Sequence, residues 1–125
     1  MLQETDVNCK EQLSKRGKRS RDKGKRGERE VAKIFQKAGF HARRSVQYNG
    51  RPGTAADVVG VPGLHLEVKF VEKERIREWY RQAERDATAS PDKDIPVIVH
   101  RKSWDPWLVT LSLGDFIKII KQEGD

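Results

Sequence analysis

The stretch ADVVGVPGLHLEVK, residues 56–69 of this 125-residue chain, constrains its fold more strongly than any other. Two apolar runs flank a Pro-Gly pair, which predicts two β-strands joined by a tight turn. Inside these strands stand Asp57, Glu67 and Lys69, although a charge is costly to bury without a partner. One face of the hairpin therefore needs an explanation other than core packing.

The alternation of LHLEVKF places His65, Glu67 and Lys69 on one face of the second strand and its apolar residues on the other. A three-residue turn at 61–63 sets Asp57 across from Glu67, with Cβ atoms about 4.5–5.5 Å apart, whereas a four-residue turn places the acids on opposite faces. Facing carboxylates repel each other unless a cation lies between them. Mg²⁺ is such a cation, because it binds one or two carboxylates together with a substrate phosphate. The hairpin therefore favours a metal site, with Lys69 stabilising phosphate charge, over a solvated strand face.

A third acid is expected from the helix that the sequence predicts over residues 27–38, where apolar residues recur at helical spacing before a glycine. Glu28 extends the apolar stripe of this helix toward the sheet, whereas Glu30 shares a face with Lys33 and Lys37. We therefore assign Glu28 to the site. When the helix is considered alone, an acid that only stabilises the positive helix N-terminus explains Glu28 equally well.

The chain is strongly basic, with 26 Lys and Arg against 19 Asp and Glu and a formal charge of +7. Such an excess indicates a polyanionic partner, and nucleic acid is the first choice. The run SKRGKRSRDKGKR at residues 14–26 holds eight basic residues and one acid. It predicts that residues 1–26 form a disordered basic arm that lies on phosphates, and that residues 27–125 form the folded domain.

The remaining composition narrows the class of protein. Cys9 is the only cysteine, which excludes an intrachain disulfide and a Cys-rich zinc site. The three histidines, His41, His65 and His100, are scattered without metal-ligand spacing. No segment has the apolar length of a membrane span, and the N-terminus lacks the apolar stretch of a signal peptide, so we expect a cytoplasmic protein without a membrane partner.

Downstream of the first helix the sequence predicts three strands, a helix, two strands and a final helix, over residues 40–47, 55–60, 64–70, 72–89, 95–102, 107–113 and 114–122. This order, αβββαββα, predicts an α/β fold with a mixed five-stranded sheet. The final helix is expected to turn Phe116, Ile117 and Ile120 inward. Trp104 and Trp107 bracket a turn, where a place in the core is favoured over stacking on exposed bases.

These residues together resemble a known family. An acid at the start of a helix, followed by D and ExK on an antiparallel hairpin, resembles the PD-(D/E)xK nuclease superfamily. Within it, GEREVAKIFQKAGFHARRS followed by ADVVG and LEVK is most similar to archaeal-type Holliday junction resolvases, including relatives carried by phages, over about residues 24–122. The resemblance implies a restriction-endonuclease-like core in residues 27–125, with helices flanking the mixed sheet.

The resemblance also implies a catalytic role for each member of the constellation. Glu28, Asp57 and Glu67 match the acids that hold Mg²⁺ in the family, assisted by the backbone carbonyl of the next residue, here Val68. We expect Mn²⁺ to substitute for Mg²⁺. Lys69 matches the lysine that assists the attacking water.

Other matches to the family are weaker. Ala56 replaces the proline of the PD motif, and YNGRPG departs from the Ser-Gly-like loop of the resolvases, a role that Ser45 partly fills. Gln82 resembles an auxiliary glutamine on the helix after ExK, although a polar boundary residue explains it equally well. The residues expected to bind DNA are basic: Lys15, Arg16, Lys18, Arg19, Arg21, Lys23, Lys25, Arg26, Arg43, Arg44 and Arg51.

The function that the resemblance implies is Mg²⁺-dependent endonucleolytic cleavage of four-way (Holliday) junctions, by attack of a metal-activated water on the phosphodiester, in DNA recombination or repair. A four-way junction has two-fold symmetry, so a homodimer is expected, joined through the last helix or residues 107–113. One alternative is another PD-(D/E)xK nuclease, restriction-like or repair-related, acting on flaps or duplexes. The other is a basic nucleic-acid-binding protein without catalysis.

Overall fold

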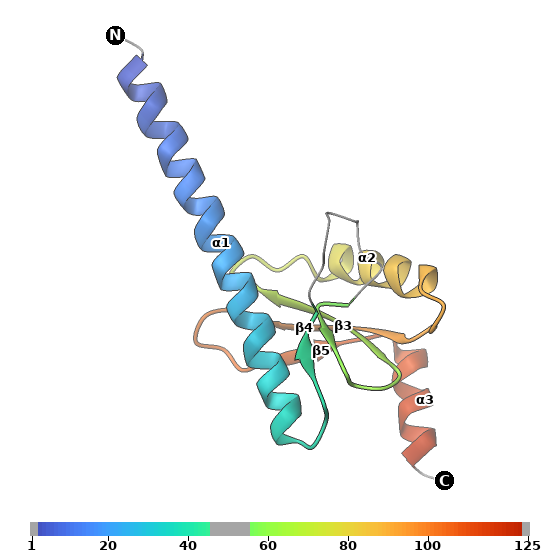
Figure 1. The fold of residues 1–125 in the computed structure, drawn as a ribbon. Helices are drawn as coiled ribbons and strands as arrows, with labels where there is room; N and C mark the ends of the chain where they lie inside the picture. Colours follow the sequence, from blue (N-terminus) through green and yellow to red (C-terminus); the bar gives the residue numbers. More distant parts are fainter. Residues whose placement is uncertain (1–2, 46–55, 124–125) are drawn as a thin grey trace.

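The computed structural model describes residues 3–45 and 56–123, which form one five-stranded mixed sheet with three helices (Figure 1). The strands lie in chain order: β1 (Arg43–Arg44), β2 (Val58–Val59), β3 (Leu64–Phe70), β4 (Ile95–Arg101) and β5 (Leu108–Thr110). Only the central β3–β4 pair is parallel, and the other neighbours are antiparallel. The helices are α1 (Gln3–Lys37), α2 (Ile76–Ala89) and α3 (Leu113–Glu123). The predicted α/β class and mixed sheet are confirmed.

The two faces of the sheet are covered by different helices. Leu66 and Val68 of β3, with the β4 residues beside them, pack against Val31 of α1 in the main core. On the opposite face of β4 lie the buried Ile98 and His100, where Trp79 of α2 approaches the His100 ring with 6.1 Å between centroids. Because side chains alternate along a strand, Glu67 and Lys69 project to the α2 side.

The hairpin of β2 and β3 has the register that the sequence predicts. Val58 pairs with Leu66 in antiparallel orientation. At the next pair of residues away from the turn, Asp57 therefore lies across from Glu67. The Asp57 N–H donates to the Leu66 carbonyl at 2.8 Å. The three-residue turn at 61–63 is thus confirmed, and with it the juxtaposition of the two acids.

The peripheral strands are shorter than expected. β1 covers two residues of the predicted strand 40–47, whose last two residues lie outside the described ranges, and β5 covers three of 107–113. The chain before β1 passes close to Gly60, where an added Cβ would lie 2.0 Å from the His41 carbonyl oxygen. Gly60 also has φ +97°, so this crossing requires glycine.

Residues 3–26, expected to form a disordered arm, instead continue α1 as one helix (Figure 1). Lys, Arg, Glu and Gln have high helix propensity, so a basic composition does not prevent a helix. Contacts with the sheet anchor the stretch. Lys23 Nζ lies 2.6 Å from Glu72 Oε1 and 4.6 Å from the centre of the Phe70 ring. Gly27 lets α1 approach closely, since a Cβ there would lie 2.9 Å from Phe70 Cβ.

The final helix α3 exposes the side chains that were expected to point inward. Phe116, Ile117 and Ile120 are 47%, 44% and 52% exposed. α3 extends away from the end of the sheet (Figure 1). Leu113 of α3 is exposed as well, and so are Leu108 and Val109, which point to opposite faces of the edge strand β5. We refer to these exposed residues as the β5–α3 apolar surface: Leu108, Val109, Leu113, Phe116, Ile117 and Ile120.

The two tryptophans of the WDPW turn differ in environment. Trp107 is half-buried, and its ring meets Phe70 edge-on at 5.7 Å between centroids. Trp104 is 99% exposed and has φ +71°, so its expected place in the core is wrong. The turn that carries it is held to α1, because Glu72 accepts hydrogen bonds from both Lys23 and Ser103.

None of the helices in the described part of the chain combines the length and the apolar character needed to cross a lipid bilayer.

Candidate active site

The assigned acids meet in a cleft of about 590 Å³, where α1 and α2 flank the C-terminal half of β3. From α1, the cleft is lined by Arg21, Gly24, Lys25 and Glu28, whose spacing of three and four residues defines one helix face. Asp57, Glu67 and Lys69 line it from the hairpin, and Gln82 and Asp86 from α2. The cleft thus combines four carboxylates with several cationic side chains.

Asp57 and Glu67 form an acidic pair in this cleft. The Val68 N–H donates to Asp57 Oδ2 at 2.9 Å and fixes the orientation of that carboxyl group. Burial, reinforced by the negative charge of Glu67, raises the pKa of Asp57 from 3.8 to about 8. Two acids that are difficult to ionise together become favourable once a divalent cation lies between them, so the pair fits the metal that the sequence predicts.

The structure separates the two helix acids. Glu28 lines the cleft, is only 20% exposed, and accepts a hydrogen bond from Arg44 Nε at 2.5 Å. Glu30 lies on another side of α1, where Arg101 approaches its carboxylate at 3.5 Å. Glu28 is therefore the acid near the hairpin pair.

The other assigned side chains lie at different distances from this centre. Lys69 and Gln82 both line the cleft. The backbone N–H of Ser45 donates to the Asp57 carbonyl at 2.9 Å. Arg51 lies outside the described residues. The catalytic and auxiliary roles of these residues stay predictions.

Two residues beside the pair were not assigned from the sequence. His65 is buried, and its Nε2 lies 2.9 Å from Glu67 Oε1. Asp86 enters the cleft from α2, one helical turn after Gln82. The two-residue spacing of His65 and Glu67 is a usable signal, because alternate residues of a strand share a face. Asp86 gave no such signal, because its place depends on how α2 docks on the sheet.

The chain matches a family model described as "Phage putative PDDEXK endonuclease" over residues 19–123. The chain belongs to this family. The resemblance to PD-(D/E)xK nucleases is confirmed, and the chain is a nuclease of the PDDEXK type, a hydrolase that acts on DNA.

A solved structure supports the same fold for this PDDEXK nuclease. It is Archaeoglobus fulgidus Hjc, described as a Holliday junction resolvase from an archaeal hyperthermophile. The two chains are 25% identical, with a TM-score of 0.53 over 70% of this chain and 76% of that chain. The restriction-endonuclease-like core is thereby confirmed. No curated protein sequence matches the chain.

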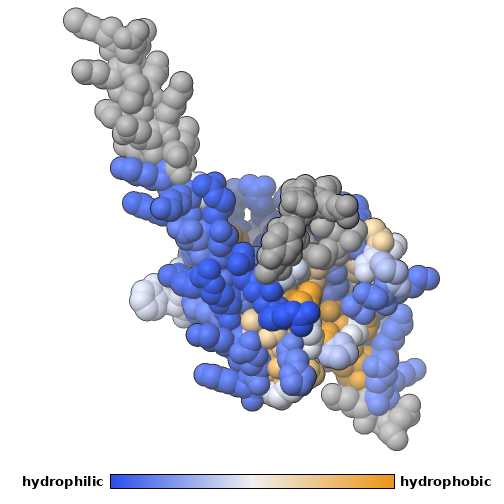
Figure 2. Space-filling view, in the orientation of Figure 1, coloured by the Kyte–Doolittle hydropathy of each residue, from blue (hydrophilic) through white to orange (hydrophobic). Residues whose placement is uncertain are grey.

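The basic residues that this PDDEXK nuclease is expected to use for DNA binding lie in different surroundings. Arg21, Lys25 and Arg44 line the cleft itself. Other basic residues of α1, most of them nearer its N-terminus, lie outside the cleft and give the helix a hydrophilic surface (Figure 2). Lys23 instead pairs with Glu72. Of the basic residues expected to bind DNA, those with exposed side chains outside the cleft are Lys15, Arg16, Lys18, Arg19, Arg26 and Arg43.

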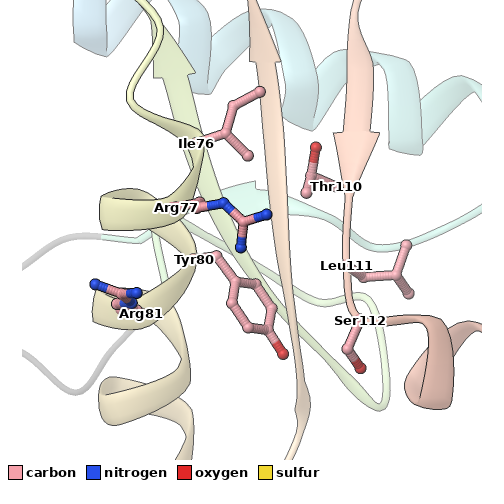
Figure 3. A pocket seen from close by; sticks show the side chains of 7 residues that line it. All are labelled: Ile76, Arg77, Tyr80, Arg81, Thr110, Leu111 and Ser112. Carbon is pink, nitrogen blue, oxygen red and sulfur yellow. The ribbon is translucent and has the colours of Figure 1, made fainter.

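A second hollow, of about 370 Å³, lies between α2 and β5, with Tyr80, Arg77 and Leu111 among its lining side chains (Figure 3). Among the residues that the structure describes, its lining includes no carboxylate and no histidine. Because a hard divalent cation needs oxygen ligands with negative charge, this hollow lacks the chemistry that the nuclease site requires.

Proposed function

We propose that this PDDEXK nuclease is a Mg²⁺-dependent, structure-specific endonuclease that cleaves four-way DNA junctions. The observation that carries the proposal is the Asp57–Glu67 pair, set face to face by the hairpin register inside a cleft lined by basic side chains. The likeness to a protein described as a Holliday junction resolvase supports junctions as the substrate class.

The acids would hold the cation through Asp57, Glu67 and the Val68 carbonyl, with Glu28 beside them. When bound, Mg²⁺ supplies positive charge for the phosphate and lowers the pKa of water. The Val68 N–H keeps the Asp57 carboxyl oriented, and Asp57 releases its proton as the cation binds. Mn²⁺ fits the same oxygen ligands.

The surrounding cations would position the DNA. Lys69 lies on the same strand face as Glu67, so its ammonium group faces the phosphate that is attacked and stabilises the charge that develops there. Arg44 is fixed by Glu28. Arg21 and Lys25 bind neighbouring phosphates along α1, with the auxiliary Gln82 on the opposite wall of the cleft. Such contacts position the DNA backbone without reading sequence.

Trp104 offers a contact of a different kind. It is a large aromatic side chain, 99% exposed, and the preceding residue, Ser103, accepts a hydrogen bond from Lys23 of α1. Stacking on an unpaired base contributes about 1–3 kcal/mol per base and tolerates any sequence. At an opened branch point the end faces of the terminal base pairs are exposed, so Trp104 fits a substrate defined by its shape.

A four-way junction also requires two cuts related by two-fold symmetry, which a homodimer provides. The β5–α3 apolar surface is the part of the described chain that fits such an interface, because six large apolar side chains are exposed on neighbouring elements. A role in DNA recombination or repair and an intracellular location follow from this substrate.

The experiment that tests the proposal offers the purified protein three labelled substrates, a four-way junction, a flap and a linear duplex, in Mg²⁺. We expect paired, symmetric nicks on the junction and little cutting of the other two. Cutting of all three would contradict junction specificity and favour a general or repair nuclease. Binding without any cutting would contradict the catalytic role and favour a binding protein.

A further inference from the structure

We propose that His65, Glu67 and Asp86 form a second metal site that prefers Zn²⁺ or Mn²⁺ to Mg²⁺. It lies beside the Asp57–Glu67 pair and shares Glu67 with it. The site does not depend on junction cleavage, because it is defined by its ligands and not by a substrate.

The geometry of the three side chains is close to that of a metal site. One ligand atom from each residue, the His65 imidazole nitrogen and a carboxylate oxygen from Glu67 and Asp86, lies within 4.8 Å of the other two. His65 Nε2 and Glu67 Oε1 are already 2.9 Å apart. Metal–ligand distances of about 2.0–2.2 Å place neighbouring ligands about 3–3.5 Å apart. A bound ion would draw the three ligand atoms closer together.

Two rigid elements hold these ligands. His65 and Glu67 share one face of β3, whose register pairs them with Pro96 and Ile98 of the central β4. Asp86 lies next to Ala87, which is buried where α2 packs on the sheet. The ligands are therefore preorganised, and a bound ion would link α2 to β3.

The charges around the cluster also favour a cation. His65 is 4% exposed. Among the residues whose side chains the structure describes, Glu67 has no other basic partner than His65. Within the same residues, no Lys or Arg forms an ion pair with Asp86. Two carboxylates thus meet beside a buried imidazole with no Lys or Arg paired to either among these residues, and a divalent cation would supply the positive charge.

The donor set determines the preferred metal. Mg²⁺ requires oxygen ligands in octahedral geometry and keeps several waters, so an imidazole nitrogen is a poor ligand for it. Zn²⁺ is commonly bound by imidazole and carboxylate together, and Mn²⁺ accepts both. Asp57 and Glu67, which offer oxygen only, suit Mg²⁺. The two neighbouring sites therefore differ in selectivity.

The test measures metal binding by calorimetry on the full chain without DNA, in a Cys9→Ser background because a thiolate is itself a zinc ligand. Asp86→Asn should weaken Zn²⁺ and Mn²⁺ binding by at least about tenfold and leave Mg²⁺ binding unchanged. Asp57→Asn should weaken Mg²⁺ binding and retain Zn²⁺. The matched control is Glu84→Gln, which changes an exposed acid on the same helix and should bind all three ions normally.

Zn²⁺ binding by Asp86→Asn at the affinity of the parent would overturn the proposal. A second measurement follows the His65 ring by NMR in the parent, so it does not depend on whether a His65 variant folds. Zn²⁺ should shift the His65 ring resonances in the parent, and at least about tenfold more Zn²⁺ should be needed for the same shift in Asp86→Asn. An unshifted ring in the parent would also overturn the proposal. Both measurements are made without DNA, so a protein that does not cleave DNA can still show the metal site. Failure of the proposed nuclease function is therefore distinguishable from failure of this proposal.

Discussion

Among single residues, Asp57 has the environment that most affects its chemistry. Because its pKa is raised from 3.8 to about 8 by burial and by Glu67, the folded metal-free chain holds a proton that the unfolded chain releases above about pH 4. Stability therefore falls as the pH rises from about 4 to about 8. A bound cation displaces this proton, so Mg²⁺ affinity should increase with pH over the same interval.

Asp57→Asn removes the ionisation and should stabilise the metal-free protein at pH 8, with little effect at pH 4. We expect Tm in EDTA to rise by about 3–6 °C at pH 8, which corresponds to roughly 1 kcal/mol for a domain of this size. Thermal unfolding followed by circular dichroism measures the shift. Asp22→Asn, at an exposed position of α1, is the control and should show no such pH dependence. An Asp57→Asn variant that is less stable than the parent at pH 8 would contradict the raised pKa.

Trp104 gives a second prediction for a single residue. Its side chain is 99% exposed, so Trp104→Ala should change stability by less than about 0.5 kcal/mol. If it stacks on a base, affinity for a four-way junction should fall by about 1–3 kcal/mol, and Trp104→Phe should retain most of it. Titration by fluorescence anisotropy measures the affinity. Trp107→Ala, which removes the ring packed on Phe70, should instead lower Tm. Unchanged junction affinity in Trp104→Ala would refute the stacking contact.

Among the elements, α1 combines two tasks, since one face lines the cleft and another packs against the end of the sheet. Its packing face centres on Phe70, whose ring lies under the Arg101 guanidinium at 4.3 Å and near Lys23 and Arg26 at 4.6 and 5.2 Å. Each cation–π contact contributes about 0.5–1 kcal/mol at partly exposed positions. These contacts explain why the basic stretch is helical at its junction with the fold.

A pair of glycine variants tests this packing. A Cβ at Gly27 would lie 2.9 Å from Phe70 Cβ, whereas a Cβ at Gly24 meets nothing within 4 Å. Gly27→Ala should therefore destabilise the fold by about 1–3 kcal/mol through overpacking. Gly24→Ala should stabilise it by about 0.5–1 kcal/mol through helix propensity. Urea unfolding compares the two variants, and equal effects would show that α1 does not approach Phe70 closely.

At the scale of the whole molecule, the features that could be predicted are those encoded in local pattern. β3 was predicted with its observed limits because apolar and polar residues alternate in LHLEVKF, which is bounded by a glycine before it and a charged loop after it. The hairpin register followed from a three-residue turn. The helical state of residues 3–26 could not be predicted, because the charge run does not reveal the anchoring of Lys23 and Gly27 on Phe70. The exposure of α3 and the entry of Asp86 into the cleft depend on how elements dock, and one sequence carries little information about docking.

The β5–α3 apolar surface yields a prediction about assembly. Phe116→Glu and Ile120→Glu place charges on side chains that are already exposed, so the variants should fold normally. In a homodimer joined by this surface, they should reduce the mass measured by light scattering from twice the chain mass of 14.4 kDa to the chain mass itself. Ile34→Glu, at an exposed apolar position of α1, should leave the mass unchanged. Dimers that persist in both α3 variants would place the interface elsewhere.

The Asp57–Glu67 pair is tested most directly by the single-turnover cleavage rate of a labelled four-way junction in Mg²⁺. Asp57→Asn and Glu67→Gln should each lower this rate by at least about 100-fold, while junction binding in Ca²⁺ stays close to that of the parent because the basic residues remain. Glu30→Gln, the matched control on the other side of α1, should cleave at the parent rate. Cleavage by Asp57→Asn or Glu67→Gln at the parent rate would contradict the catalytic role of the pair.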